Sequence, residues 1–322
     1  MRPPIPLVVG PPTKNLVFHT KARNLQQHLS ADFEVVIHHD TPQVRASLEN
    51  GELEYAAVLG LNRGLFSPRH RRLLPRIGLM VCSEWSVRSR QRHWGMERRE
   101  VIELMRECRS VCFNNQRQVE DYSPYLDNVH YTPNGVNPAE FFPVPTANRS
   151  PGDILRVGFA AKLISHDNLP SKKGYATIKT ALEGVAGLEL RLAELPQQNN
   201  GPYDLDANRS EMNRFYQDID IYVCASEEEG TPNPCLEAGL VGKPVITTPV
   251  GNMPELIHHG VNGLLFDVND SERLRAHLIL LRDNIELRLD LGQALRQTIL
   301  RNWTWQHQSH AYAEFFRELA GS

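Results

Sequence analysis

A strand, an acidic turn, a helix and a second strand follow one another within residues 219–248. Ile219 to Ala225 is a mainly apolar run, and Pro244 to Thr248 is similar, as expected for strands buried on both faces of a parallel sheet. Cys235 to Val241 has helical composition, with proline before it and glycine directly after it. The order predicts an α/β fold in which residues 226–234 form a turn at the carboxyl edge of a parallel sheet.

The acidic turn has the composition of a site for a ligand with both phosphate and sugar groups. Parallel sheets bind ligands at this edge, and the N–H groups of a helix N-terminus attract anions. Since the two prolines of the turn have no N–H, the expected donors are the N–H groups of Gly230, Thr231, Asn233, Cys235 and Leu236. The glutamates at 227–229 would repel phosphate unless they bind other groups, and sugar hydroxyls are suitable partners for a carboxylate.

Seven residues separate Glu229 from Glu237, and a segment reading GKPVITTPVG and then PELI follows at 242–257. In this strand–turn–helix–strand setting, the pattern strongly resembles the retaining glycosyltransferases of family 4. The resemblance implies the GT-B fold, an α/β architecture of two Rossmann-like domains whose parallel sheets face an interdomain cleft. It also implies that Glu229 holds hydroxyls of the donor sugar and Glu237 the ribose diol. The alternative is that these carboxylates only interact with a helix dipole, worth about 0.3–1 kcal/mol each.

The resemblance also predicts the domain organisation. It is clear over residues 129–319, which include a Pro-Asn-Gly-Val segment at 133–136, and holds only in outline over 1–128. We expect an N-terminal acceptor domain over 1–147 and a C-terminal donor-binding domain over 153–302, with a last helix at about 305–319 that packs back on the first domain. The strand and helix patterns in the first sixty residues alternate as βαβαβ, which favours a parallel sheet there as well.

Two lysines are candidates to bind the diphosphate of the donor. Members of the family carry Gly-Arg-Leu after the first strand of the second domain and Lys-Gly a few residues later. The counterparts here are Lys162 and Lys173, although another register would put Phe159 at the arginine position. With Glu229, these lysines are the predicted catalytic residues, because cations stabilise the charge that develops on a departing diphosphate. No side chain is an evident nucleophile, so the resemblance implies front-face substitution with retention of configuration.

The first domain departs from the family pattern. The turn at 10–15 has one glycine and two prolines where the family has a glycine-rich turn, and Ser83 and Glu84 stand where related enzymes often have a histidine against the donor sugar. We expect Ser83 and Glu84 to face the sugar or the acceptor. These departures leave open a non-catalytic nucleotide- or glycan-binding protein on the same scaffold. A nicotinamide-dependent oxidoreductase is disfavoured because residues 158–163 lack a three-glycine turn.

Charge and composition limit the partners. Ten arginines and two acidic residues lie between Arg63 and Arg99, a stretch that is either a solvated surface or a face for an anionic or carrier-linked acceptor or an acidic membrane. The formal net charge of −3 and the scarcity of stacking aromatics near this stretch argue against nucleic acid. The five cysteines lack zinc spacing, and no apolar run is long enough to span a membrane. We expect a cytoplasmic, metal-independent enzyme with no cofactor besides its nucleotide-sugar co-substrate.

Overall fold

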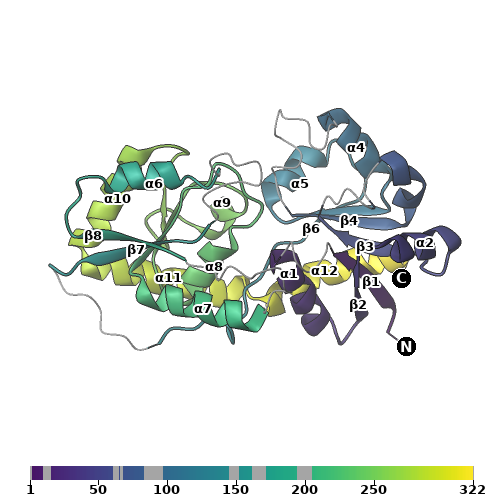
Figure 1. The fold of residues 1–322 in the computed structure, drawn as a ribbon, viewed down its shortest axis with the longest axis horizontal. Coiled ribbons are helices and arrows are strands. Elements are labelled where there is room, and N and C mark those ends of the chain that lie inside the picture. Colours follow the sequence, from purple (N-terminus) through teal and green to yellow (C-terminus); the bar gives the residue numbers. More distant parts are fainter. Residues whose placement is uncertain are drawn as a thin grey trace. The chain divides into compact units, whose positions relative to one another are not determined.

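The computed structural model describes residues 2–9, 16–60, 65, 68–82, 97–144, 152–161, 172–193 and 205–321. The chain divides into two compact units (Figure 1). The first contains the described residues up to 135 and from 305 onward, and the second contains those of 136–193 and 206–304. The chain enters the second unit at Val136, before the expected end of the first domain at 147. The N–H of Val136 donates to the carbonyl of Trp303 at 3.0 Å, and Phe141 packs against Tyr216.

The first unit is built on a six-stranded parallel sheet with the order β2-β1-β3-β4-β5-β6. Its strands are β1 (Pro4–Val9), β2 (Glu34–His39), β3 (Ala56–Leu59), β4 (Ile77–Val81), β5 (Ser110–Phe113) and β6 (Val129–Tyr131). Its helices are α1 (Leu16–His28), α2 (Pro42–Asn50), η1 (Pro68–Arg76), α4 (Arg98–Glu107), α5 (Gln116–Tyr122) and α12 (Trp305–Ala320). Buried side chains of α1 and α12 cover one face of the sheet, and those of η1, α4 and α5 cover the other.

The last helix of the chain supplies part of the core of the first unit. Phe315, Phe316 and Leu319 of α12 are fully buried in the cluster that includes β1 and β3. Gly78 of β4 leaves room for this helix, since a Cβ atom there would lie 2.8 Å from the ring of Phe315. The hydroxyl of Tyr312 donates to the carbonyl of Thr132 at 2.7 Å, which ties α12 to the residue that follows β6.

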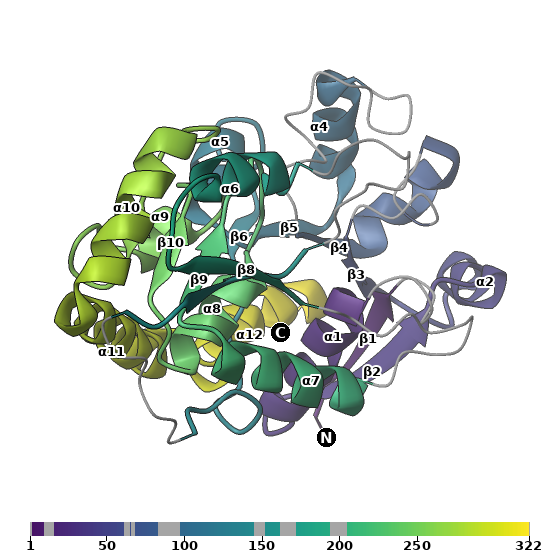
Figure 2. The same cartoon turned by 60° about the vertical axis from the view of Figure 1, so that its left-hand side comes forward.

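The second unit has a five-stranded parallel sheet with the order β11-β10-β9-β7-β8. Its strands are β7 (Leu155–Phe159), β8 (Leu188–Leu192), β9 (Ile221–Cys224), β10 (Val245–Thr247) and β11 (Leu264–Leu265). Its helices are α6 (Tyr175–Leu182), α7 (Leu205–Asp218), α8 (Asn233–Leu240), α9 (Met253–Leu256), α10 (Ser271–Asp283) and α11 (Ile285–Asn302). Helices α6 and α10 cover one face of the sheet, and α7, α8 and α11 cover the other (Figures 1 and 2).

Both sheets confirm the predicted α/β class with parallel strands. In the second sheet, β7 lies between β8 and β9, so the direction in which the chain adds strands reverses at β7. Ligands of open α/β sheets bind at the carboxyl ends of the strands beside such a reversal. The site is therefore expected where β7 and β9 end.

Candidate functional site

The acidic turn lies at the carboxyl end of β9, beside the N-terminus of α6. Gly174 precedes α6 with φ of 73°, and a Cβ atom at this position would lie only 1.9 Å from the carbonyl oxygen of Ala225. The N–H of Glu227 donates to the carbonyl of Lys172 at 2.9 Å. This close contact between two backbones brings the residues that precede α6 against the turn that precedes α8.

The structure brings two of the predicted catalytic residues together. Lys173 forms an ion pair with Oε1 of Glu229, and the hydroxyl of Ser226 donates to the same oxygen at 2.8 Å. The side chain of Lys173 is 38% exposed and that of Glu229 is 14% exposed, so the pair lies at the surface of the turn. Burial lowers the pKa of Lys173, but the charge of Glu229 and the hydrogen bond to it outweigh this effect, and the pKa is raised. The ammonium is therefore charged at neutral pH.

A second ion pair lies one residue earlier in each segment. Lys172 Nζ is 3.5 Å from Oε2 of Glu228. The two lysines thus compensate two of the three negative charges at 227–229, which reduces the repulsion that a phosphate would meet at this turn. Glu228 fits a structural role, whereas Glu229 keeps a second carboxylate oxygen for which no hydrogen bond is recorded among the described residues.

Glu237 lies in α8 and contacts a residue that the sequence did not suggest. The hydroxyl of Tyr216, in α7, donates to Oε2 of Glu237 at 2.7 Å. Burial raises the pKa of Glu237, and the hydrogen bond from Tyr216 and the charge of Arg209 oppose this rise. Tyr216 precedes Glu237 by 21 positions on another helix, so neither spacing nor motif could have indicated the contact.

The backbone donors of the turn differ in part from the expectation. The N–H of Asn233 donates to the carbonyl of Thr231, and that of Cys235 to the carbonyl of Pro232, each at 2.9 Å. Helix α8 begins at Asn233 rather than Cys235, and its first turn uses these two N–H groups. The expectation that Asn233 and Cys235 offer N–H groups to a ligand is therefore corrected. The N–H groups of Gly230, Thr231 and Leu236 remain the predicted donors.

Gly251 and Asn252 support the turn from the segment after β10. The N–H of Asn252 donates to the carbonyl of Gly230 at 3.1 Å. Gly251 has φ of 55°, and a Cβ atom there would lie 2.3 Å from the same carbonyl oxygen. The Gly251–Asn252 backbone thus fixes the middle of the acidic turn, which explains why the motif extends beyond the helix to residue 251.

We expect Thr231→Val to raise the free energy of unfolding by about 1 kcal/mol, because the hydroxyl of Thr231 is buried without a hydrogen-bond partner in the described structure and such a group costs about 1–3 kcal/mol. Urea denaturation measures this change. If Thr231 also contacts the donor, the same variant binds the donor more weakly. Ser226→Ala is the contrasting variant, since its hydroxyl has a partner and its loss is expected to destabilise the protein. A Thr231→Val protein that is less stable than the wild type would contradict the prediction.

Several predicted features lie outside the described residues: Lys162, Ser83, Glu84 and the turn at 10–15. Their assignments stay predictions. Asp218 and Asp220, which imitate a metal-binding Asp-x-Asp pattern, lie at the opposite end of β9 from the acidic turn. There, Asp218 forms an ion pair with Arg156, and Asp220 accepts a hydrogen bond from the N–H of Arg156 at 2.8 Å.

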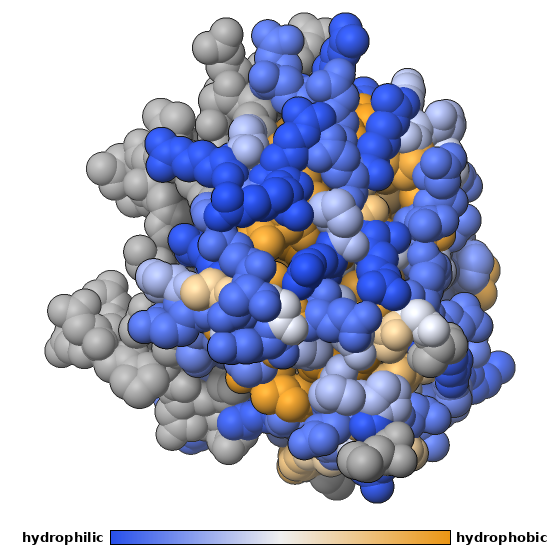
Figure 3. All heavy atoms as spheres, turned by 90° about the vertical axis from the view of Figure 1, so that its right-hand side faces the viewer, coloured by the Kyte–Doolittle hydropathy of each residue, from blue (hydrophilic) through white to orange (hydrophobic). Residues whose placement is uncertain are grey.

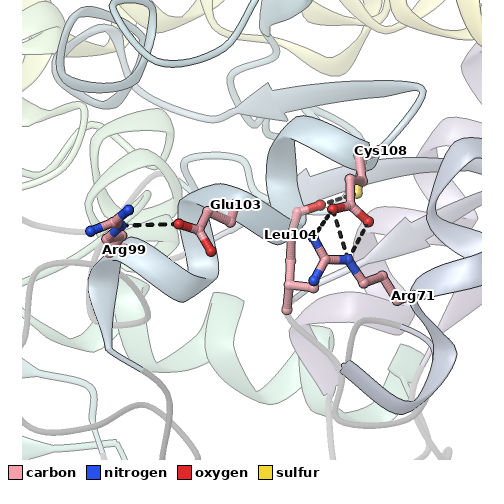
Figure 4. A network of polar contacts seen from close by, with 6 residues as sticks. Arg71, Arg99, Glu103, Leu104 and Cys108 are labelled. Atoms are coloured by element: carbon pink, nitrogen blue, oxygen red, sulfur yellow. Dashed lines mark hydrogen bonds and ion pairs between the residues drawn. The ribbon is translucent and has the colours of Figure 1, made fainter.

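Most described arginines of the basic stretch are bound within the first unit. Nε of Arg71 lies 2.8 Å from both carboxylate oxygens of Glu107, and Nε of Arg99 is 3.0 Å from Glu103 (Figure 4). Arg72 pairs with Glu49, Arg76 donates to the carbonyl of Leu48, and Arg98 lies over the ring of Tyr122. These arginines have partners already, which favours a structural role over an anion-binding one.

The face of the molecule in Figure 3 is covered mainly by hydrophilic residues, with hydrophobic residues in small areas. No helix in the described part of the chain is both long and apolar enough to cross a membrane. Among the described residues, no three His, Cys, Asp or Glu side chains come together in a way that could hold a metal ion.

The two parallel sheets define the class of fold, which is that of the GT-B glycosyltransferases. A structure of sucrose-phosphate synthase from Thermosynechococcus elongatus matches with a TM-score of 0.74 and 15% identity, covering 100% of both chains. A structure of HepE from Anabaena in complex with UDP and glucose matches with a TM-score of 0.69 and 14% identity, covering 98% of this chain and 99% of that one.

Part of the second unit is similar in sequence to a known family. Residues 166–298 match the family model of the glycosyl transferases group 1, in agreement with the predicted resemblance to a glycosyltransferase. The GDP-mannose-dependent alpha-(1-6)-phosphatidylinositol monomannoside mannosyltransferase of Mycobacterium tuberculosis is 25% identical over 219 residues, which are 59% of this chain and 56% of the relative. The chain spans about half the length of this curated relative. The region that matches the family model, residues 166–298, contains Lys173, Glu229 and Glu237.

Proposed function

We propose that this protein transfers a sugar from a nucleotide-diphosphate sugar to an acceptor hydroxyl, with retention of configuration and without a metal ion. The observation that carries the proposal is the contact between Lys173 and Glu229 where β9 ends, inside the region that matches the family model. A cation for phosphate and a carboxylate for hydroxyls thus lie side by side at the edge where such sheets bind ligands.

Each member of this pair can bind the donor while the pair persists. An ammonium has three N–H groups and Glu229 occupies one, so Lys173 keeps two for oxygens of the diphosphate. Oε1 of Glu229 accepts from Lys173 and Ser226, which leaves Oε2 for hydroxyls of the sugar. The charge that develops on the leaving diphosphate would be stabilised by Lys173, by the N–H groups of Gly230, Thr231 and Leu236, and by Lys162 if it reaches the site.

We propose the class of the acceptor from the charge of residues 1–150 alone. An anionic or carrier-linked acceptor suits the net positive charge of residues 1–150, and contact with an acidic membrane would serve a lipid carrier. The name of the Mycobacterium tuberculosis relative specifies a phosphatidylinositol mannoside for that protein. A panel of lipid-linked and anionic sugars is therefore the first set of acceptors to test.

Donor binding is expected to raise the Tm of the protein, because a ligand that binds only the folded state stabilises it by about 2.7 kcal/mol at a hundred times its Kd. UDP, GDP, ADP, CMP and dTDP sugars are compared by thermal shift, with Lys173→Met as the variant that loses the shift and Lys172→Met as its matched control. The absence of a shift with every nucleotide sugar would contradict the proposed function.

Transfer is then measured with the donor that binds. The product is expected to keep the anomeric configuration of the donor by NMR, and chelation of divalent cations is expected to leave the rate unchanged. Saturable binding without transfer or donor hydrolysis across the acceptor panel would instead identify a nucleotide- or glycan-binding protein.

A further inference from the structure

Tyr216 is a fully buried polar side chain beside the candidate site. It has no exposed surface, and its hydroxyl donates to Oε2 of Glu237 at 2.7 Å. Its ring makes edge-to-face contacts with the rings of Phe141, Phe215 and Tyr222, whose centroids lie 5.9, 5.3 and 5.8 Å away. Because three aromatic rings fix the phenol, the position of its hydroxyl is fixed as well.

We propose that Tyr216 is a positioning residue for the donor nucleotide: its hydroxyl holds one carboxylate oxygen of Glu237, so that the other oxygen is presented to one of the two hydroxyls of the ribose diol. The inference rests on the proposed function and on the assignment of Glu237 to the ribose, which the resemblance implies. A glutamate loses side-chain rotamer freedom when it is fixed by a ligand. The bond from Tyr216 removes that freedom before the nucleotide arrives, which favours binding through preorganisation.

The same hydrogen bond favours the ionised form of Glu237. Burial raises the pKa of this carboxyl, while the hydroxyl of Tyr216 and the charge of Arg209 lower it. Among the described residues, three side chains interact with Glu237: Tyr216 and Arg209 from α7, and Tyr222 from β9. The pKa values of both tyrosines are raised well above the ordinary value, mainly by burial, so both stay neutral. Arg209 also forms an ion pair with Glu140, so its charge is shared between two carboxylates.

The ionisation of Glu237 determines how nucleotide affinity changes with pH. Nucleotide affinity is expected to fall as the pH decreases through the pKa of Glu237, because a protonated carboxyl forms a weaker hydrogen bond with the ribose hydroxyl. Without the Tyr216 hydroxyl, one of the two interactions that lower the pKa of Glu237 is lost, so this pKa rises further. The decrease in affinity then begins at a higher pH.

Tyr216→Phe tests the inference, because it keeps the ring contacts and removes only the hydroxyl. Calorimetric titration with UDP, GDP and ADP across the acidic and neutral range gives Kd as a function of pH. For the nucleotide that binds, we expect the variant to raise Kd about 10-fold at neutral pH, which corresponds to the loss of about 1.4 kcal/mol, and to shift the acidic decrease to higher pH. Tyr222→Phe is the matched control: this ring is equally buried, and its hydroxyl makes no recorded hydrogen bond to Glu237.

A double variant separates this role from a structural one. In a Glu237→Gln background, Tyr216→Phe is expected to change neither Kd nor its pH dependence further, because the carboxylate that it positions is gone. The 2′-deoxy and 3′-deoxy nucleotides add a second measurement: one of the two should bind the wild type about 10-fold more weakly than the parent nucleotide, and this difference should shrink in Tyr216→Phe.

The outcomes distinguish this inference from the proposed function. If the wild type binds a nucleotide but Tyr216→Phe and Tyr222→Phe have the same Kd and the same pH profile, the positioning role is overturned while the proposed function stands. If the 2′-deoxy and 3′-deoxy nucleotides lose affinity equally, the proposal that Glu237 presents one oxygen to one ribose hydroxyl is also overturned. A wild-type protein that binds none of the three nucleotides contradicts the proposed function itself.

Discussion

Lys173→Met is expected to lower kcat/KM for sugar transfer about 10²–10³-fold, the loss typical of removing one preorganised donor to a developing negative charge. Methionine keeps most of the length and apolar stem of the side chain but cannot donate a hydrogen bond. The variant therefore removes the charge that faces the diphosphate and leaves the carboxylate of Glu229 without its cation. Steady-state kinetics with the donor found by thermal shift measures the loss.

The neighbouring ion pair provides the matched control. Lys172→Met removes an equal charge one residue earlier, where Lys172 pairs with Glu228, and is expected to change kcat/KM by less than about 10-fold because exposed ion pairs contribute about 0–1 kcal/mol. Glu229→Gln should reduce kcat/KM as strongly as Lys173→Met, and the double variant should lose less than the sum of the two, since the residues act as a pair. Equal activities of Lys173→Met and Lys172→Met would contradict the assignment.

The effect of Lys173→Met is expected to be the same at every pH from neutral to weakly basic. The pKa of Lys173 is raised in the folded protein, so the ammonium stays charged throughout this range. For the same reason, the stability that the pair contributes is fully present below the ordinary lysine value of 10.5 and is lost only as the pH rises through the raised pKa. The contribution is small because Lys173 is 38% exposed to solvent.

Gly174→Ala is expected to destabilise the second unit and to abolish donor binding. The backbone at Gly174 is left-handed, which costs an L-residue about 1–2 kcal/mol, and the added methyl group would lie 1.9 Å from the carbonyl oxygen of Ala225. Relief of that clash must move α6 away from the end of β9, and Lys173 moves with it. Thermal unfolding and the nucleotide thermal shift measure the two effects.

Gly184→Ala separates the cost of the backbone conformation from the cost of the clash. Gly184 has a similar φ of 71° with no heavy atom within 4 Å of an added Cβ atom. We expect Gly184→Ala to lower Tm by about 2–8 °C, the result of a loss of 1–2 kcal/mol at about 2–4 °C per kcal/mol, and to leave nucleotide binding intact. Gly174→Ala should lower Tm clearly more. If the two variants have the same Tm and both bind nucleotide, the close contact between Gly174 and Ala225 is not needed for stability or for nucleotide binding.

The sequence predicted the local parts of the site because local patterns carry them. The apolar runs at 219–225 and 244–248 predicted strands that contain β9 and β10, and the prolines of the acidic turn indicated the start of α8 to within two residues. The lysine before Gly174 was recognisable from its motif. The contact between Lys173 and Glu229 could not be predicted from the sequence, because the two residues are 56 positions apart in the chain and only the order of β7 and β9 in the sheet brings them together.

The errors have physical causes. Asn233 and Cys235 were expected to offer N–H groups, but the first turn of α8 uses both internally. Composition left the role of the arginine-rich stretch open, and the pairing of Arg71 with Glu107 could not be predicted because only the packing of η1 against α4 brings these two residues together. The contact of Tyr216 with Glu237 could not be predicted, because a buried tyrosine in an amphipathic helix is indistinguishable in sequence from an ordinary core residue.

The position of α12 determines the order in which the two units can mature during synthesis. All core residues of the second unit precede Trp305, whereas the first sheet gains the cover of α12 only after residues 305–320 have been made. The usual sequence of events, in which N-terminal parts fold first on the ribosome, is therefore reversed for the final step. The second unit can fold before Phe315 and Leu319 are available to pack against Gly78 of β4. A nascent chain that stops short of α12 would therefore have a complete second unit and an incomplete first unit.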